Sequence, residues 1–350
     1  MGVLWLWPPL GHTHTKIRRA FAARGVAVDG SAGDCLAVTV SEAAFHTLRD
    51  LAAHDLSEVE RNQCKYLLLP DGGYPTISDF GRVNSLTHLL AHITGRWLVE
   101  LLAERRLTTH FQPIVRTDDP QHVFAYECLV RGVDADGQLI NPGQLYDAAR
   151  DASLLYHLDR SARLQHISAA CRHGLKTVVF INFNPTSIYD PEFCLRSTVA
   201  AIQGTGMRPE NFVFEVVESD HVTDLERLPR ILEYYRSAGF RVALDDLGAG
   251  YSSLNLLGML RPDFIKLDMN LVRGIDCDPY KGEIVGKLIE SAHNLGVEVI
   301  AEGVETVGEW NWAAIHGADY TQGYLFGKPC DSPQPSCAIG RAAVQVAANY

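Results

Sequence analysis

The sequence predicts an α/β protein in which a TIM-like (β/α)8 barrel follows a small α/β domain. From residue 109 onward, expected strands and helices alternate about eight times over roughly 240 residues, which is the length and rhythm of such a barrel. The first 74 residues carry a shorter alternation of their own. With 350 residues and 47% hydrophobic content, the chain can bury one large core and one small core.

The small domain is expected over residues 1–74. Its expected strands are short apolar runs, and its expected helices carry apolar residues at helical spacing. It contains no phosphate-binding loop, metal-ligand spacing or catalytic motif, so we expect a regulatory or interaction role. The expected strands are residues 3–7, 35–40 and 65–69, and the expected helices are residues 15–24 and 41–54.

A helical connector is expected over residues 75–108. Two segments, 79–94 and 97–106, carry apolar residues at the spacing of an amphipathic helix. The second segment ends in three charged residues, which is typical of a solvated helix end. We therefore expect two helices to link the small domain to the barrel.

The barrel domain is expected over residues 109–350. Its strands are predicted where short apolar runs occur, because strands buried on both faces of a parallel sheet have nearly continuous apolar sequences. The expected strands are residues 110–115, 123–129, 177–182, 212–218, 241–245, 264–268, 297–302 and 320–322. The expected helices are residues 146–151, 158–171, 191–203, 224–237, 280–295 and 308–316.

Charge and cysteine content exclude several classes of protein. A net charge of −11 argues against binding to a nucleic-acid polymer, which needs a basic surface. The eight cysteines form no C-x-x-C pair, so we expect reduced thiols and no structural zinc site. The apolar residues 1–10 lack a basic segment and include two prolines, which makes a poor signal peptide. No stretch approaches the roughly 20 apolar residues of a membrane span, so we expect a cytoplasmic protein.

One stretch, residues 242–253, combines a buried strand with paired acids. Its apolar run ends in Asp245 and Asp246, and a glycine-bracketed turn with two hydroxyl residues follows. Adjacent strand residues point to opposite faces, but a chain that turns at the strand end can bring both carboxylates to one site. Paired acids repel unless a cation lies between them. This stretch alone leaves two interpretations open, a divalent metal site or a turn that caps the next helix.

A polar residue lies at or near the carboxyl end of seven expected strands. In a barrel these ends meet on one face, so acids, amides and one lysine would surround a common centre. So many carboxylates would repel without cations, and oxygen-only ligands suit Mg²⁺ or Mn²⁺. Two such ions support in-line displacement at phosphorus, and a lysine among carboxylates can position the attacking water. The residues are Glu127, Asn182, Glu215, Asp245 with Asp246, Lys266, Glu302 and Gln322.

Seven separated motifs surround these residues. In order they are Glu127-Cys128-Leu129, Ile181-Asn182, Glu215-Val-Val-Glu218, Asp245-Asp246-Leu-Gly-Ala-Gly-Tyr-Ser-Ser-Leu254, Ile265-Lys266-Leu-Asp268, Ala301-Glu302-Gly-Val-Glu305-Thr306 and Gln322-Gly-Tyr324. This order resembles the EAL-domain family over about residues 109–335. The resemblance implies a modified barrel with one antiparallel strand. It also implies a phosphodiesterase that hydrolyses cyclic di-GMP to linear pGpG with two Mg²⁺ or Mn²⁺ ions.

The resemblance further implies roles for the residues at the strand ends. Lys266 would hold the nucleophilic water, Glu302 would bind metal or assist as a base, and Gln322 would position water or substrate. The implied metal ligands are Glu127, Asn182, Glu215 and Asp245, with Asp246 for the second metal and Glu302 as a further candidate.

Four further implications concern the substrate and the oligomeric state. Gln112 and Arg131 match positions that contact the backbone of the substrate, with Arg131 as a phosphate partner. Glu218 matches the residue that braces the loop after Asp246. That loop and the following helix are where members of the family dimerise, so a homodimer is implied.

The sequence departs little from the family pattern. Cys128 replaces the alanine of the motif, and Leu247 and Ala249 replace a common phenylalanine and threonine in the loop after Asp246. Because no metal ligand is missing, we expect an active enzyme. One alternative is a catalytically silent receptor that binds cyclic di-GMP and signals through the N-terminal domain, and another is a different metal-dependent phosphoesterase on the same scaffold.

Overall fold

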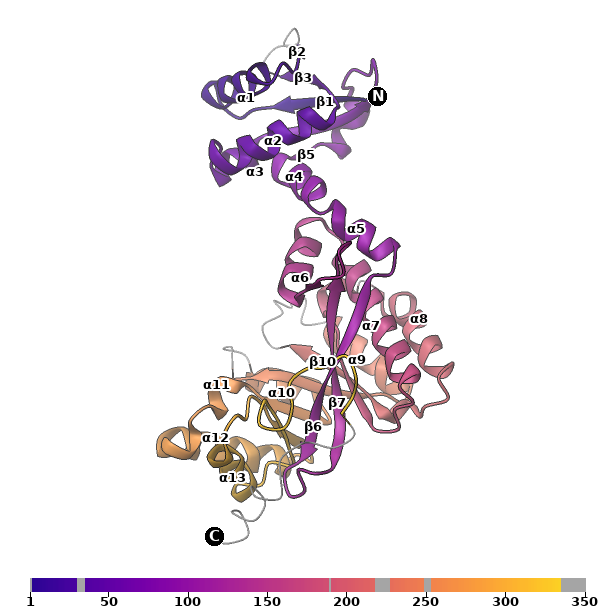
Figure 1. Cartoon of the computed structure of the whole chain (residues 1–350), viewed down its shortest axis with the longest axis vertical. Coiled ribbons are helices and arrows are strands. Elements are labelled where there is room, and N and C mark those ends of the chain that lie inside the picture. The colour runs from indigo at the N-terminus through magenta and orange to yellow at the C-terminus, as the bar shows by residue number, and fades with distance from the viewer. Residues whose placement is uncertain (1, 30–34, 189, 218–226, 249–252, 335–350) are drawn as a thin grey trace. The chain divides into compact units, whose positions relative to one another are not determined.

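A computed structural model describes residues 2–29, 35–188, 190–217, 227–248 and 253–334. The chain folds into two compact units (Figure 1). The N-terminal unit comprises Met1–Glu100 with Tyr146–Leu154, and the barrel unit comprises Leu101–Leu145 with Leu155–Tyr350. Among the described helices, none is long and apolar enough to cross a membrane.

The N-terminal unit contains an antiparallel sheet with the strand order β2-β3-β1-β4-β5. Alternate residues of the central strand β1 face a core formed with the helices, where Leu4 and Leu6 are buried with Ile17 and Phe21 of α1 and Leu48 of α2. The strands are β1 (Gly2–Trp7), β2 (Val28–Asp29), β3 (Leu36–Thr39), β4 (Lys65–Pro70) and β5 (Asn84–Ser85). The helices are α1 (Gly11–Ala23), α2 (Glu42–His54), α3 (Glu58–Gln63), α4 (Leu86–Thr94) and α5 (Arg96–Ala103).

The predicted helix over residues 79–94 is wrong in its first half. Residues Ile77–Arg82 form a 3₁₀ helix, η1, and β5 follows as an edge strand paired with β4. The α-helix α4 begins only after Ser85, whose side chain caps it by accepting a hydrogen bond from the backbone N–H of His88. The second predicted helix, 97–106, ends at Ala103, because the chain enters the first strand of the barrel at Leu107.

The barrel unit is a closed barrel of eight strands in the order β6-β14-β13-β12-β11-β10-β9-β7, closed by the pairing of β6 with β7. Strand β6 is antiparallel to both of its neighbours, and the other neighbouring strands are parallel. This confirms the predicted modified barrel with one antiparallel strand (Figure 1). The strands are β6 (Leu107–Arg116), β7 (Val123–Val133), β9 (Val178–Asn182), β10 (Phe212–Val217), β11 (Arg241–Leu247), β12 (Phe264–Leu267), β13 (Glu298–Ala301) and β14 (Tyr320–Gln322), and the short β8 (Leu139–Ile140) pairs with β7.

Helices cover the outside of the barrel, and several of them begin at recognisable capping residues. Asp190 caps α8, Asp278 caps α12, and Thr306 forms a capping box with Glu309 at the start of α13. The helices of the barrel unit are α7 (Leu155–Arg172), α8 (Pro191–Gln203), α9 (Arg227–Ser237), α10 (Ser253–Leu260), α11 (Met269–Val272), α12 (Pro279–Asn294) and α13 (Val307–Ile315), whereas most of α6 (Pro142–Asp151) belongs to the N-terminal unit. The short 3₁₀ turns are η2 (Pro185–Ser187), η3 (Pro209–Asn211) and η4 (Ile275–Cys277).

The barrel strands divide their side chains between two cores. Residues such as Val179 and Ile181 point outward and join one large apolar cluster that includes side chains of the surrounding helices. The alternate residues point inward, and one residue from each strand forms a closed apolar layer inside the barrel. This layer consists of Ile114, Ala125, Phe180, Val213, Ala243, Phe264, Ile300 and Tyr320.

Candidate active site

The candidate site residues form the inward layer next to this apolar layer. A strand places alternate residues on one face, so a step of two residues from each member of the apolar layer gives the next inward position. For example, Ala243 is followed by Asp245, and Phe264 is followed by Lys266. The eight positions reached in this way are Gln112, Glu127, Asn182, Glu215, Asp245, Lys266, Glu302 and Gln322. The apolar layer therefore closes the barrel beneath a polar layer at the carboxyl ends of the parallel strands.

Lys266 lies at the centre of this polar layer. Its side chain is 1% exposed, and its Nζ lies 2.7 Å from Glu302 Oε1 and 2.8 Å from Glu215 Oε1. The same Nζ lies 3.0 Å from Asp245 Oδ1 and 3.6 Å from Glu127 Oε2. When all of these groups are ionised, one ammonium faces four carboxylates, so most of the negative charge of the cluster stays uncompensated.

Two side-chain amides orient the carboxylate of Glu127. Asn182 Nδ2 donates to Glu127 Oε1 over 3.1 Å, and Gln322 Nε2 donates to Glu127 Oε2 over 2.6 Å. Since each amide uses its nitrogen toward Glu127, each has its carbonyl oxygen available for another partner. Gln322 Oε1 is buried and has no hydrogen-bond partner among the described residues.

Burial and mutual repulsion raise the pKa values of the clustered acids. Burial raises the pKa values of Glu215 and Glu302 well above the usual range, with Lys266 opposing and neighbouring carboxylates adding to the shift. Burial and then the neighbouring Asp245 raise the pKa of Asp246 to about 6. Burial acts against the charged form of Lys266, but the surrounding carboxylates outweigh it and raise the pKa of its amine. Extra positive charge in the cluster would therefore favour the ionised acids.

Asp245 and Asp246 approach one site although they are neighbours on a strand. Asp246 has a φ of 55°, in the left-handed region, and the register of β11 with β12 shifts between Leu244 and Leu247. This irregularity breaks the alternation of side chains, so one carboxylate oxygen from each of Asp245, Asp246 and Glu302 lies within 4.8 Å of the others. A non-glycine residue in this region is strained by roughly 1–3 kcal/mol, and such strain is frequent at functional sites. The observed grouping favours the metal-site interpretation of this stretch over a helix cap.

The donor set fits two divalent cations. A second group of three carboxylates, Glu127, Glu215 and Asp245, also has ligand oxygens within 4.8 Å of one another, and the two groups share Asp245. Within the described part of the chain, Glu215 Oε2 is buried without a hydrogen-bond partner. An orphaned carboxylate oxygen is costly unless a cation binds it, and ligands made only of oxygen suit Mg²⁺ or Mn²⁺.

Two of the remaining predicted site residues, Gln112 and Arg131, lie outside the group of carboxylates around Lys266. Gln112 belongs to the polar layer, but its Nε2 donates to the backbone oxygen of Gly327 over 3.4 Å. Arg131, four residues beyond Glu127 on β7, forms no ion pair with a carboxylate in the described ranges. Burial lowers the pKa of Arg131, and the charge of Glu127 opposes that shift. Glu218 and residues 249–252 of the loop after Asp246 lie outside the described residues, so the loop-bracing role and the dimer contact stay predictions.

Asp268 lies near the cluster, although the sequence motifs predict no role for it. Asp268, two positions after Lys266, is buried, and its charge contributes to the raised pKa of Asp246. Its side chain also caps α11 by accepting a hydrogen bond from the N–H of Asn270. The signal for Asp268 was its position two residues beyond Lys266, the same step that separates members of the inward layers.

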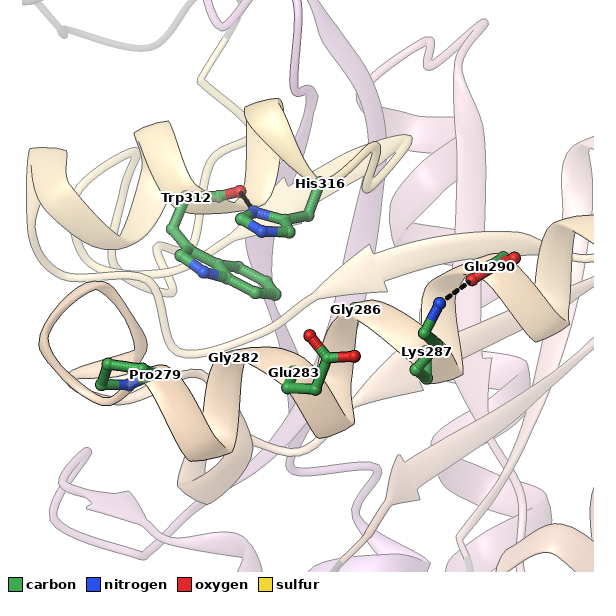
Figure 2. A pocket seen from close by; sticks show the side chains of 8 residues that line it. All are labelled: Pro279, Gly282, Glu283, Gly286, Lys287, Glu290, Trp312 and His316. Atoms are coloured by element: carbon green, nitrogen blue, oxygen red, sulfur yellow. Dashed lines mark hydrogen bonds and ion pairs between the residues drawn. The ribbon is translucent and has the colours of Figure 1, made fainter.

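A groove elsewhere on the barrel unit contains none of the predicted site residues. It has a volume of about 450 Å³ and lies between α12 and α13, where Trp312 stacks on His316 with 3.9 Å between ring centroids (Figure 2). Gly282 and Gly286 form the part of α12 that faces these rings. The charged residues at its rim include Lys287, which pairs with Glu290 on the same helix. The groove therefore shares no lining residue with the carboxylate cluster.

Comparison with known proteins identifies the barrel unit. The EAL domain family matches residues 96–329. A standalone EAL protein from Vibrio cholerae O395, solved with c-di-GMP bound, is 36% identical, with a TM-score of 0.60, and the match covers 66% of this chain and 95% of that one. The probable cyclic di-GMP phosphodiesterase PdeG of Escherichia coli K12 is 29% identical over 228 residues, which is 63% of this chain and 44% of PdeG.

Two further facts set the scope of these similarities. The match spans between 30% and 44% of the length of the first curated relatives, which are therefore much longer proteins. Klebsiella pneumoniae BlrP1 shares the fold over 96% of this chain and 99% of its own, with a TM-score of 0.60 at 23% identity. Because the family match covers most of the chain and the polar layer carries the motifs quoted above, the protein belongs to the EAL domain family.

Proposed function

We propose that this protein is a phosphodiesterase that hydrolyses cyclic di-GMP to linear pGpG with two Mg²⁺ or Mn²⁺ ions. The observation that carries the proposal is the complete polar layer, in which carboxylates from four strand ends surround Lys266. The names of relatives such as PdeG and the ligand of the Vibrio cholerae protein support cyclic di-GMP as the substrate.

The two groups of carboxylates provide one set of ligands for each ion. Glu127, Glu215 and Asp245, with the carbonyl oxygen of Asn182, would hold the first ion, and Asp245, Asp246 and Glu302 would hold the second. Ions bound there would neutralise charge on the phosphate and make a bound water nucleophilic near neutral pH. This arrangement also explains why carboxylates outnumber cationic side chains in the layer.

The chain's own groups would position the water and accept its proton. Neighbouring carboxylates raise the pKa of the Lys266 amine in the metal-free site, so its ammonium is suited to donate a hydrogen bond to the water. Glu302, whose Oε1 lies 2.7 Å from Lys266 Nζ, is the best-placed acceptor for the proton of that water. Gln322 would orient the water or the substrate through its Oε1, which has no hydrogen-bond partner among the residues that the structure describes.

Two residues beside the cluster would bind the substrate. The guanidinium of Arg131 is a suitable partner for a phosphate, because it can donate two parallel hydrogen bonds and has no described carboxylate partner. Gln112 would contact the substrate backbone from the antiparallel strand β6. We further propose a cytoplasmic homodimer that uses the loop after Asp246 and α10, with the N-terminal unit as its regulatory part.

Product analysis tests this function. Purified full-length protein should convert cyclic di-GMP to pGpG with Mg²⁺ or Mn²⁺ and should stop when the metal is chelated. Glu127→Ala should abolish turnover, whereas Glu290→Ala, which removes an exposed glutamate of α12, should retain it. Binding of intact cyclic di-GMP by wild-type protein without product in either metal would contradict the enzyme and favour the receptor alternative.

A further inference from the structure

A buried ion pair on a helix outside the barrel contacts the turn that follows Asn182. Asp159 and Arg163 lie one helical turn apart on α7 and form an ion pair in which neither side chain is more than 1% exposed. Arg163 Nε also donates to Thr198 Oγ1 of α8 over 3.3 Å. Neither charged residue belongs to the polar layer, so the proposed catalytic chemistry gives the pair no role.

The carboxylate of Asp159 binds the turn with both of its oxygens. Its Oδ1 accepts a hydrogen bond from the backbone N–H of Asn184 over 3.0 Å, and its Oδ2 accepts one from Ser187 Oγ over 3.0 Å. Both donors belong to the turn around η2, which starts directly after β9 and its last residue, Asn182. A helix outside the barrel therefore anchors the chain two residues beyond a proposed metal ligand.

Stability alone is a poor explanation for this pair. Burying two charges carries a large desolvation penalty, and well-packed apolar residues often replace a buried ion pair without loss of stability. What an ionised aspartate supplies here is two acceptor oxygens, whereas an asparagine would turn an N–H₂ group toward one of the two donors. The guanidinium of Arg163 pairs with this carboxylate, whose two oxygens hold the turn at two points.

The turn directly follows Asn182, whose side chain contacts another proposed metal ligand. Asn182 Nδ2 donates to Glu127 Oε1 over 3.1 Å, which leaves the carbonyl oxygen of Asn182 for a cation. The backbone N–H of Phe183 donates to the backbone oxygen of Glu215 over 3.1 Å, so the turn also lies against the strand of another proposed ligand. A shift of the turn would move Asn182 relative to the first group of carboxylates.

We propose that Asp159 is a positioning residue that sets metal affinity by holding the turn after Asn182. The inference rests on the proposed function for the identity of the ligand, a divalent cation, but the contact between Asp159 and the turn is independent of it. Ser187→Ala leaves no buried charge and removes a hydroxyl whose single proton is shared between Asp159 Oδ2, at 3.0 Å, and the backbone oxygen of Asn184 within the turn, at 2.7 Å. Thr198→Val is the matched control, because it removes a buried hydrogen bond of Arg163, and within the described residues the Thr198 side chain forms no hydrogen bond with the turn or the polar layer.

The test measures Mn²⁺ binding to the full-length protein by calorimetry, together with hydrogen exchange of the backbone amides of residues 183–187. Asp159→Asn should weaken Mn²⁺ binding about tenfold, as expected for an outer-shell partner of a metal ligand. Ser187→Ala should weaken it about threefold, in line with the loss of one hydrogen bond. Both variants should speed exchange of the turn amides, and Thr198→Val should lower stability while leaving Mn²⁺ affinity unchanged.

Several outcomes would overturn the inference. Wild-type Mn²⁺ affinity in both Asp159→Asn and Ser187→Ala would do so, as would an equal loss of affinity in Thr198→Val and Ser187→Ala. If Asp159→Asn does not fold, the comparison of Ser187→Ala with Thr198→Val decides. If wild-type protein binds no Mn²⁺, the proposed function fails, and unchanged exchange of the turn amides in Ser187→Ala would separately refute the anchoring role.

Discussion

Replacing Lys266 by methionine should destabilise the metal-free protein and make its stability depend on divalent cations. The methionine side chain has a similar volume, so the main change is the loss of the ammonium that lies within 3.6 Å of four carboxylates. Removing one partner of a buried ion pair lowers the free energy of unfolding by about 3–5 kcal/mol, because the remaining charge is left uncompensated. We expect a loss of this size in the free energy of unfolding of the barrel unit in the presence of a chelator.

Divalent cations should offset much of this loss. A ligand at 100 times its Kd stabilises a folded protein by about 2.7 kcal/mol, and a cation takes over the electrostatic role of the missing ammonium. The assay is urea unfolding of wild-type and Lys266→Met protein with chelator and with Mn²⁺. Lys287→Met, which breaks an exposed pair with Glu290, is the control and should change stability by no more than about 1 kcal/mol. Equal stability of Lys266→Met and wild type in chelator would refute the assigned electrostatics.

Three further predictions concern pH and the N-terminal unit. Folding raises the pKa of Asp246 from 3.8 to about 6, so the metal-free protein should lose stability as pH rises through that interval. Mn²⁺ affinity measured by calorimetry should rise over the same interval, and a flat profile would contradict this. Glu60 has its pKa lowered from 4.5 to about 2 by hydrogen bonds from the Ser57 backbone and Thr13, so its stabilising effect should be lost as pH falls through that range; Glu60→Gln should remove this dependence in acid unfolding of the N-terminal unit. Deleting residues 1–94, which removes the N-terminal sheet together with α1 to α4, should leave the barrel folded but change turnover or oligomeric state, measured by product analysis and sedimentation, and no change in either would argue against a regulatory role.

The polar layer could be predicted from the sequence because its spacing is simple. Each parallel strand is a short apolar run, and the functional residue follows two positions after an inward apolar residue, as Asp245 follows Ala243. Since the carboxyl ends of all parallel strands meet on one face, knowing the strands was enough to bring their end residues together. The family motifs added the antiparallel strand β6, which the apolar pattern does not distinguish from a parallel one.

The edge of the N-terminal sheet could not be predicted in the same way. Phe80, Val83 and Leu86 have helical spacing, but Phe80 is 81% exposed and Val83 lies between η1 and β5. The pairing of Asn84 with Tyr66 overrides that local pattern, because an edge strand depends on a partner distant in the sequence. Periodicity describes one segment at a time and cannot report such a partner.

The anchoring contact of Asp159 could not be predicted from a local sequence pattern either, because it also joins residues that are distant in the sequence. Its two partners in the turn lie 25 and 28 residues away along the chain, and an aspartate on a helix is usually solvated. Only the packing of α7 against β9 turns this acid inward toward the turn. Contacts of this kind depend on tertiary structure, so the sequence motifs predict the proposed metal ligands but not the residues proposed to hold those ligands in position.

The most direct test of the central claim counts the metal ions at the polar layer. Electron paramagnetic resonance of full-length protein titrated with Mn²⁺ should report two bound ions per chain with a spectrum that shows magnetic coupling between close neighbours, since the two carboxylate groups share Asp245. Glu127→Ala should lose the coupled signal. A single isolated ion, or no bound Mn²⁺ at saturating concentration, would contradict a two-metal phosphodiesterase at this site.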